Sequence, residues 1–196
     1  MKIYWSPRTR SFASLWALEE TGMPYEAVLT DISTGAQKTS DYLAINPMGK
    51  VPALKDGGLS VAESAAIIAY IAERYPDAHL APPIGDPHRA KYLQWMFFAA
   101  NIEAAITQIF TKIEMPTSSA GWGSATQVFD VLDKAVETGP WLLGDTFSAA
   151  DIVIGSGLNF AVCAFQMVPA RPSFDRYLDR CAVRPAFKAA EKIGAG

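Results

Sequence analysis

The sequence predicts a small α/β sheet domain followed by an all-helical domain. In the first 76 residues short β-type runs alternate with helical runs, whereas the residues after His88 carry only helical spacing of apolar side chains. The segment between the halves, "PDAHLAPPIGDPHR", is rich in proline and glycine, a composition typical of linkers. We therefore predict domains at residues 1–77 and 88–196, joined by a linker at 78–87.

Composition restricts the function classes. With 196 residues, 50% hydrophobic content and a net charge of -3, the chain has enough apolar side chains for one large or two small cores. A pI near 5.4 without a basic stripe argues against a nucleic-acid partner. Met1-Lys2 does not lead into a signal-peptide apolar region, and residues 152–165 are too short and interrupted for a membrane span. With only Cys163 and Cys181, we expect no disulfide framework, no metal site and a reducing, cytoplasmic setting.

In the first half, the sequence predicts a strand–helix–strand segment, followed by a short helical or irregular segment, two strands and a helix. Lys2–Trp5 is a short strand, Ser11–Thr21 is a helix that ends at Gly22-Met23-Pro24, and Tyr25–Thr30 is a second strand. "TSDYLAINPMGKVPAL" then indicates a short helical or irregular segment, a turn, and a strand around residues 51–54. Asp56-Gly57-Gly58 predicts an antiparallel hairpin, and "ESAAIIAYIAERY" a helix that Pro76 stops.

The second half shows helical spacing of apolar residues between glycine and proline breaks. Four helices are predicted, at His88–Glu114, Ser124–Thr138, Asp151–Cys163 and Phe174–Ile193. No internal repeat or low-complexity segment is evident. The second domain is therefore expected to contain helices alone.

The hinge between the first strand and the first helix carries the first candidate site. Its residues Ser6-Pro7-Arg8-Thr9 supply two hydroxyls, and Arg8 and Arg10 supply positive charge. A helix N-terminus offers unpaired N–H groups and a partial positive charge, which favour an anion beside it. The hinge suits a thiolate, a phosphate or a carboxylate; alternatively, Ser6-Pro7 caps the helix and the arginines are solvated.

A second candidate site is the start of the helix at residues 63–75. Ser64 takes the N-cap position, and Ile67 stands where a capping box would place Glu or Gln. This helix end is thus open to an external anion, and Glu63 could receive an ammonium group. The pair could bind both charges of an amino acid, unless it is an ordinary cap with a solvent-facing glutamate. Nearby, Val51-Pro52 opens a strand, but only about one X-Pro bond in twenty is cis, so the sequence leaves the isomer open.

These segments, in this order, resemble the glutathione S-transferase family over essentially the whole chain. "NPMGKVPAL" is similar to the family's cis-proline segment, and "VAESAAIIAYIAERYP" to its Glu-Ser glutathione motif. "LLGDTFSAADIVIGSGL" is similar to the folding signature of the C-terminal domain, where Ser148 and Asp151 form an S-x-x-D cap. The resemblance implies a thioredoxin-like N-terminal domain, an all-α C-terminal domain and two-fold homodimers.

The resemblance also implies how glutathione, the co-substrate, binds. Its peptide backbone would pair with Val51, the residue before the expected cis Pro52, and its γ-glutamyl end would meet Glu63 and Ser64. Its glycyl carboxylate would meet basic or amide side chains upstream. The candidates for that contact are Gln37, Lys38 and Lys50.

Departures from the family's classes narrow the chemistry at the sulfur. The hinge holds no cysteine; Arg10 stands where the bacterial beta class has one, and Ala104 stands near that class's helix histidine. The zeta-type Ser-Ser-Cys run is also missing. The spacing of Ser6 and Arg10 matches theta and phi enzymes, so Ser6 is the first candidate donor to a glutathione thiolate. Thr9 and Ser11 are the competing hydroxyls, and Arg10 with the helix end could stabilise the anion without one.

An electrophile pocket would involve the first long helix of the second domain. The candidate residues are Trp5, Phe12, Phe98, Asn101, Glu103 and Phe110, with Phe97, Met115 and Trp122 as further candidates. Apolar stripes at helical spacing are more often core than pocket. The expected activity is conjugation of glutathione to a small hydrophobic electrophile. The alternatives are a noncatalytic glutathione- or protein-binding member of the fold and a glutathione-dependent peroxidase or dehalogenase.

Overall fold

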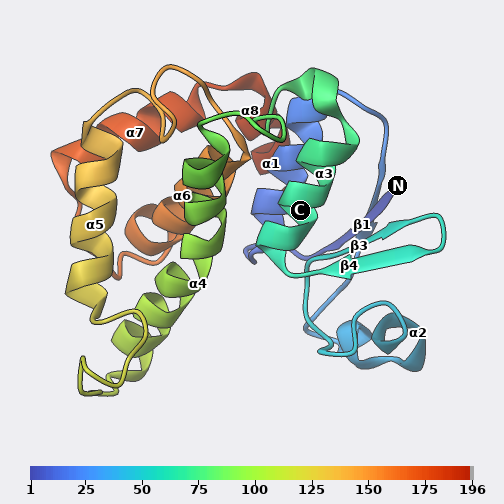
Figure 1. Cartoon of the computed structure of the whole chain (residues 1–196). Helices are drawn as coiled ribbons and strands as arrows, with labels where there is room; N and C mark the ends of the chain where they lie inside the picture. The colour runs from blue at the N-terminus through green and yellow to red at the C-terminus, as the bar shows by residue number, and fades with distance from the viewer. Residues whose placement is uncertain (195–196) are drawn as a thin grey trace. The chain divides into compact units, whose positions relative to one another are not determined.

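The computed structural model describes residues 1–194 and divides into two compact units (Figure 1). The N-terminal unit comprises residues 1–81 together with the segment from Val183 to the end of the described chain. The helical unit comprises Pro82–Ala182. The boundary at residue 81 lies inside the stretch 78–87 that the sequence indicated as a linker.

The sheet of the N-terminal unit has four strands in the order β2-β1-β3-β4. β1 runs parallel to β2 and antiparallel to β3, and β4 is antiparallel to β3. The hairpin is confirmed, with Gly57 and Gly58 between its strands, but β3 begins two residues later than predicted because Pro52 cannot donate to the ladder. The strands are β1 (Lys2–Trp5), β2 (Glu26–Leu29), β3 (Ala53–Asp56) and β4 (Leu59–Ala62).

Helices cover this sheet. α1 (Ser11–Thr21) packs against α3 (Ser64–Arg74), and both contact strands of the sheet. Because side chains alternate along a strand, Ile3 and Trp5 are buried on one face while Tyr4 points to the other. There the Tyr4 ring meets Tyr42 in an edge-to-face contact with centroids 5.8 Å apart. Tyr42 belongs to the one-turn helix α2 (Ser40–Leu43), which follows the 3-10 turn η1 (Ala36–Lys38); a further turn, η2 (Pro76–Ala78), follows α3.

The helical unit is built around α6, nearly all of whose residues are buried. Its elements are α4 (Arg89–Thr111), α5 (Ala125–Glu137), α6 (Ala149–Leu158), the π-helical η3 (Asn159–Ala164) and α7 (Pro172–Ala182). The helix predicted at Asp151–Cys163 is therefore α6 continued by η3. None of the helices within residues 1–194 is long and apolar enough to cross a membrane.

The start of α6 carries the predicted S-x-x-D cap. The Asp151 carboxylate accepts hydrogen bonds from the Ser148 backbone N–H at 2.9 Å and from the Ser148 hydroxyl at 3.1 Å. It also accepts from the Leu142 N–H and the Tyr177 hydroxyl, each at 2.9 Å. Burial raises the pKa of Asp151, while these four donors act in the opposite direction. The cap therefore ties the start of α6 both to the preceding loop and to α7.

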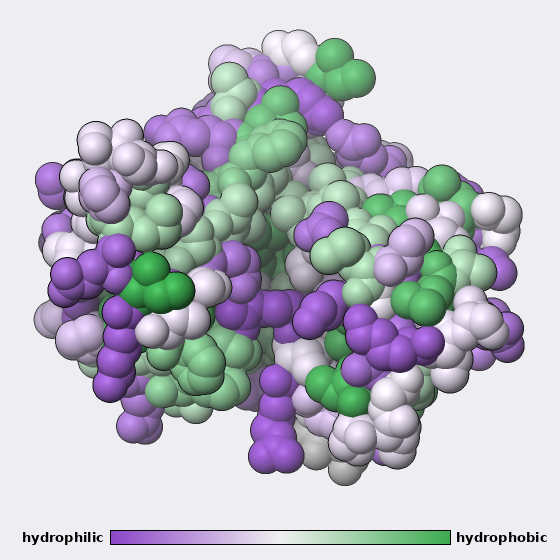
Figure 2. Space-filling view, turned by 90° about the horizontal axis from the view of Figure 1, so that it is seen from below, coloured by the Kyte–Doolittle hydropathy of each residue, from purple (hydrophilic) through white to green (hydrophobic). Residues whose placement is uncertain are grey.

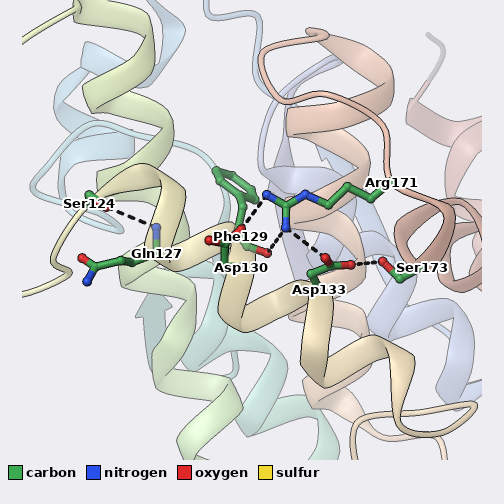
Figure 3. Close-up of polar contacts among 7 residues, drawn as sticks. All are labelled: Ser124, Gln127, Phe129, Asp130, Asp133, Arg171 and Ser173. Carbon is green, nitrogen blue, oxygen red and sulfur yellow. Dashed lines mark hydrogen bonds and ion pairs between the residues drawn. The ribbon is translucent and has the colours of Figure 1, made fainter.

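An arginine joins α5 to the residues that begin α7 (Figure 3). The Arg171 guanidinium lies 2.8 Å from an Asp130 carboxylate oxygen and 3.1 Å from one of Asp133, and it donates to the Phe129 carbonyl at 3.3 Å. The Ser173 hydroxyl donates to the other Asp133 oxygen. This hydrogen bond does most to lower the pKa of the Asp133 carboxyl, and the Arg171 guanidinium lowers it further. The side chain of Arg171 is 26% exposed, so this cluster is partly shielded from solvent.

The C-terminal segment differs from the prediction in two respects. Instead of one helix at Phe174–Ile193, the chain forms α7 and then α8 (Pro185–Gly194). Pro185 lacks a backbone N–H and is suited only to a first helical turn, so it begins a new helix. α8 then packs on α1, which places it in the N-terminal unit. The helical domain predicted at 88–196 is thus too long at its C-terminal end.

Candidate functional site

The strand register brings three of the candidate segments to the same end of three neighbouring strands, β1, β3 and β4. The last pairs of the two ladders are Tyr4 with Ala53 and Ala53 with Ala62. Trp5, Pro52 and Glu63 adjoin these last pairs in the chain, and Ser6, Val51 and Ser64 lie one residue further from them. Neighbouring strands lie about 4.8 Å apart. The hinge, the proline segment and the start of α3 therefore lie side by side.

The hinge hydroxyls of Thr9 and Ser11 are engaged with the hinge itself. Thr9 Oγ1 lies 2.7 Å from the Ser6 carbonyl and 2.9 Å from Ser11 Oγ, and it accepts from the Ser11 N–H at 3.2 Å. Ser11 Oγ also accepts from the Ser6 N–H at 3.4 Å, and the Ser11 side chain is fully buried. These two hydroxyls stabilise the turn from strand to helix and are already occupied.

Ser6 differs from its neighbours. Its residue is 4% exposed, and among the described residues its hydroxyl makes no hydrogen bond. Although the residue is mostly buried, its hydroxyl oxygen is reached by solvent. Within residues 1–194, Ser6 Oγ is therefore a donor without a partner, one residue beyond the end of β1.

The first turn of α1 is less open than the sequence suggested. Thr9 Oγ1 accepts from the Ser11 N–H, the Thr9 carbonyl from the Phe12 N–H at 3.3 Å, and the Arg10 carbonyl from the Ala13 N–H at 3.3 Å. The expectation of unpaired N–H groups at the start of this helix is therefore wrong for residues 11–13. The helix dipole and the hydroxyl of Ser6 remain as stabilising features for an anion.

The arginines of the hinge have different backbone conformations. Arg8 is exposed and adopts a φ of 54°, a left-handed conformation that is uncommon for residues other than glycine. Arg10 takes the N-cap position of α1 with a φ of -61° and is half-buried. Both guanidinium groups add positive charge to the segment around Ser6.

The proline segment is held in place by α2. The Val51-Pro52 peptide bond is cis, as the resemblance implied. The carbonyl of Lys50, one residue earlier, accepts from the Tyr42 hydroxyl at 2.6 Å and from Asn46 Nδ2 at 2.8 Å. Burial raises the pKa of Tyr42 to about 12, so its hydroxyl remains a donor at neutral pH. These two hydrogen bonds fix the backbone at Lys50, directly before Val51 and the start of β3.

Gly49 allows this segment to approach η1. It adopts a φ of 59°, and a Cβ atom there would lie 2.8 Å from the Gln37 carbonyl oxygen and 2.8 Å from Lys38 Nζ. We expect Gly49→Ala to destabilise the protein by about 2–4 kcal/mol, because left-handed backbone costs about 1–2 kcal/mol for alanine and the backbone oxygen cannot move away freely.

Gly57 provides the control for that prediction. Its φ is also 59°, but a Cβ atom there would meet no atom within 4 Å. Gly57→Ala should therefore show only the backbone part of the cost in chemical denaturation. Equal losses of unfolding free energy in the two variants would contradict a steric role for Gly49.

The residues proposed for the glycyl carboxylate lie on η1 and beside the proline segment. Lys38 Nζ donates to the Met48 carbonyl at 3.2 Å, and Gln37 Nε2 to the Ile32 carbonyl at 3.3 Å. Gln37 Oε1 is buried and has no partner among the described residues, which leaves an acceptor unsatisfied. Lys50 is exposed, and its side chain makes no hydrogen bond or ion pair within the described residues.

Glu63, and not Ser64, is the N-cap residue of α3, so the predicted cap is wrong by one position. Ser64 is the first helical residue. Glu63 has a φ of 68° and a ψ of 118°, a strained conformation for a residue with a side chain. No side chain among the described residues caps this helix. The start of α3 is therefore open to an anion, and the exposed carboxylate of Glu63 stands beside it.

The predicted electrophile residues are distributed over both units. In the N-terminal unit Trp5 is 7% exposed, its Nε1 being buried without a partner among the described residues, and Phe12 packs on Phe187 of α8. All others belong to the helical unit: Phe98, Asn101 and Trp122 are half-buried, and Phe97, Glu103, Phe110 and Met115 are exposed. Figure 2 shows hydrophobic side chains interspersed with hydrophilic ones on the face seen from below. Exposed apolar residues alone thus do not define an electrophile surface.

Several residues that hold the proline segment and α1 in place were not found by sequence reasoning. Tyr42 and Asn46 fix the Lys50 carbonyl, and their only sequence signal is proximity to the turn at Pro47. Arg184 and Phe187 act on α1 from the far end of the chain, and no local pattern indicates that contact. Within residues 1–194, no group of three or more His, Cys, Asp or Glu side chains could hold a metal ion.

Comparison with known proteins decides the family. Residues 2–73 match the family model of the glutathione S-transferase N-terminal domain. Over its full length the chain is 31% identical to BphK, a bacterial transferase solved as a ternary complex, with a TM-score of 0.83 and complete coverage of both chains. The chain belongs to the glutathione S-transferase family.

Further relatives of this transferase chain span it almost completely. Glutathione S-transferase GstA of Escherichia coli O157:H7 is 29% identical over 192 residues, with 94% of each chain covered. A sphingomonad glutathione S-transferase solved in complex with glutathione is 33% identical, with a TM-score of 0.79, covering 100% of this chain and 99% of that one. The fold of this chain, a thioredoxin-like domain with a mixed four-stranded sheet plus a helical domain, is that of the family.

Proposed function

We propose that this transferase conjugates the thiol of glutathione to a small hydrophobic electrophile, by alkyl or aryl transfer. The observation that carries the proposal is the Ser6 hydroxyl, which makes no hydrogen bond within residues 1–194 and follows the end of β1, beside the ends of β3 and β4 that adjoin Pro52 and Glu63. The solved relative with bound glutathione supports the choice of co-substrate.

The segments at this end of the strands offer a partner for each part of glutathione. The backbone of Val51, just before β3, pairs with the peptide through main-chain hydrogen bonds. The open end of α3 with Ser64 receives the γ-glutamyl carboxylate, and Glu63 receives its ammonium group. We assign the glycyl carboxylate to Lys50, Lys38 and Gln37. Lys38 contacts the Met48 carbonyl in the proline segment, and the side chain of Gln37 has an unsatisfied oxygen among the described residues. No metal takes part in this proposal.

The hinge then stabilises the sulfur as an anion. A free thiol has a pKa of about 8.5, so little of it is ionised at neutral pH. Ser6 donates a hydrogen bond to the thiolate, and the α1 dipole with Arg8 and Arg10 adds positive potential. Each pKa unit of depression corresponds to about 1.4 kcal/mol. The thiol proton leaves to solvent and the thiolate electron pair forms a carbon–sulfur bond. The bond from that carbon to its leaving atom breaks with its electron pair, which releases halide from a halide substrate or gives an alkoxide that takes a proton from solvent when an epoxide opens.

Product analysis tests the proposal. The protein is incubated with glutathione and a panel of aryl halides, alkyl halides and epoxides, and conjugates are identified by mass spectrometry. Conjugate formation above the uncatalysed rate supports a transferase. Binding of glutathione without turnover of any electrophile would instead favour a noncatalytic protein. Oxidation of glutathione that depends on peroxide, without conjugates, would favour a peroxidase.

We also propose that the chain is a cytoplasmic homodimer, as the family resemblance implies. Exposed apolar side chains on α4, Leu93 at 40% and Phe97 at 78%, stand one turn apart and are suited to burial against another surface. Light scattering at micromolar concentration should give twice the mass of 21.2 kDa. A monomer mass would contradict the dimer without affecting the assignment of the glutathione site.

A further inference from the structure

α8 lies along α1 in the N-terminal unit, although it ends the described chain. Arg184, just before α8, contacts Glu20 near the end of α1, and Phe187 contacts Trp16 and Phe12 further back. A Cβ atom at Gly194, the last residue of α8, would lie 4.0 Å from Phe12 Cδ2. The two helices are therefore antiparallel, and α8 reaches the turn of α1 that follows the hinge.

The polar end of this contact is a bidentate ion pair. Arg184 Nε lies 2.6 Å from Glu20 Oε1, and its Nη2 lies 2.7 Å from Glu20 Oε2. Trp16 Nε1 also donates to Glu20 Oε1 at 2.8 Å. The side chains of Arg184 and Glu20 are 27% and 9% exposed, so the pair is largely shielded from solvent. It fixes the C-terminal end of α1 to the start of α8.

The apolar part of the contact lies closer to the hinge. The Phe187 ring is edge-on to Phe12 and Trp16, with centroids 5.0 and 4.9 Å apart, and Phe187 is 3% exposed. Phe12 directly follows Ser11, whose hydroxyl and N–H hold Thr9 and Ser6 in the hinge. A displacement of Phe12 therefore moves the hydrogen-bonded turn that supports Ser6.

We infer that α8 is a positioning element for the thiolate site, with Phe187 as its principal positioning residue. This inference rests on the proposed function. Phe187 fixes Phe12 and thereby the first turn of α1, and that turn holds Ser6 where its hydroxyl meets the sulfur. A donor stabilises an anion best when its position is set before the charge appears. Without the contact from Phe187, Ser6 would be positioned less firmly and would stabilise the thiolate less.

The test compares the pKa of the bound glutathione thiol in three variants, by ultraviolet titration of the thiolate. Phe187→Leu keeps an apolar side chain but removes the ring contacts, and should raise that pKa by about half a unit to one unit, a three- to tenfold loss of thiolate below it. Glutathione affinity should change less than about threefold, because Glu63, Ser64 and Val51 are untouched. Arg184→Gln acts at the distant end of α1 and should give a smaller shift.

Arg171→Gln is the matched control. This substitution, like Arg184→Gln, breaks an arginine–carboxylate cluster, and the two arginine side chains are similarly exposed. The Arg171 cluster, however, joins α5 to the start of α7 in the helical unit (Figure 3). Arg171→Gln should lower thermal stability and leave the thiol pKa unchanged. Phe187→Met replaces Phe187→Leu if the latter fails to fold.

The outcomes separate this inference from the proposed function. A parent chain that binds no glutathione, or binds it without forming a thiolate, would overturn both. A parent with a depressed thiol pKa that neither Phe187 variant raises would overturn the positioning role alone. An equal shift in Arg171→Gln would show that general loss of stability, and not the contact with α1, moves the pKa.

Discussion

Replacing Ser6 with alanine is expected to raise the pKa of bound glutathione by about one to two units. A hydrogen bond to a charged group contributes about 1.5–3 kcal/mol, and one pKa unit corresponds to about 1.4 kcal/mol. Conjugation near neutral pH should slow about ten- to hundredfold, because the reactive species is the thiolate. Affinity for glutathione should stay nearly constant, since the other contacts hold the peptide. Ultraviolet titration of the thiolate and calorimetry measure the two effects separately.

The neighbouring hydroxyls supply the comparison. Thr9→Val and Ser11→Ala remove hydroxyls that bind each other and the backbone of Ser6, so these variants should lower stability. Their effect on the thiol pKa should be smaller than that of Ser6→Ala. A larger shift in either of them would move the sulfur contact to that residue. No shift in any of the three would leave Arg10 and the α1 dipole as the stabilising groups.

Glu63→Gln is expected to weaken glutathione binding about ten- to a hundredfold. The carboxylate of Glu63 is the proposed partner of the γ-glutamyl ammonium group, and a charge-assisted hydrogen bond contributes about 1.5–3 kcal/mol. Glutamine keeps the length of the side chain, so the change removes charge and little else. The maximal rate at saturating glutathione should fall far less than the affinity, because the thiolate site is intact. Calorimetry gives the affinity directly.

Glu26→Gln is the control for that substitution. Glu26 pairs with Lys2 at 2.8 Å and lies at the start of β2, at the opposite end of the strands from the hinge. The same loss of charge there should leave glutathione affinity unchanged. Unaltered affinity in Glu63→Gln, or an equal loss in Glu26→Gln, would contradict the assignment of Glu63.

Local patterns predicted most of the fold. The apolar spacing of α1 and α3, the Asp56-Gly57-Gly58 hairpin and the cap formed by Ser148 and Asp151 are confirmed, because each depends on residues close together in the chain. The hinge, the proline segment and the start of α3 were found separately. They lie close together because of the order of the strands in the sheet, and no local sequence pattern predicts that order.

Contacts between distant residues account for what was missed. The packing of Phe187 on Phe12 joins the last helix to the first, so no periodicity within α8 could assign that helix to the N-terminal unit. The role of Thr9 in closing the first turn of α1 depends on a side-chain rotamer. The shift of the N-cap from Ser64 to Glu63 reflects the unusual φ of Glu63, a conformation for which glycine would be the usual signal.

A crystal structure of the protein with glutathione tests the central claim most directly. The sulfur should lie within hydrogen-bonding distance of Ser6 Oγ, with the peptide paired to the backbone of Val51 and the γ-glutamyl end between Glu63 and Ser64. A sulfur closer to Thr9 or Ser11 than to Ser6 would contradict it, and so would a glutathione bound away from the hinge, the proline segment and the start of α3.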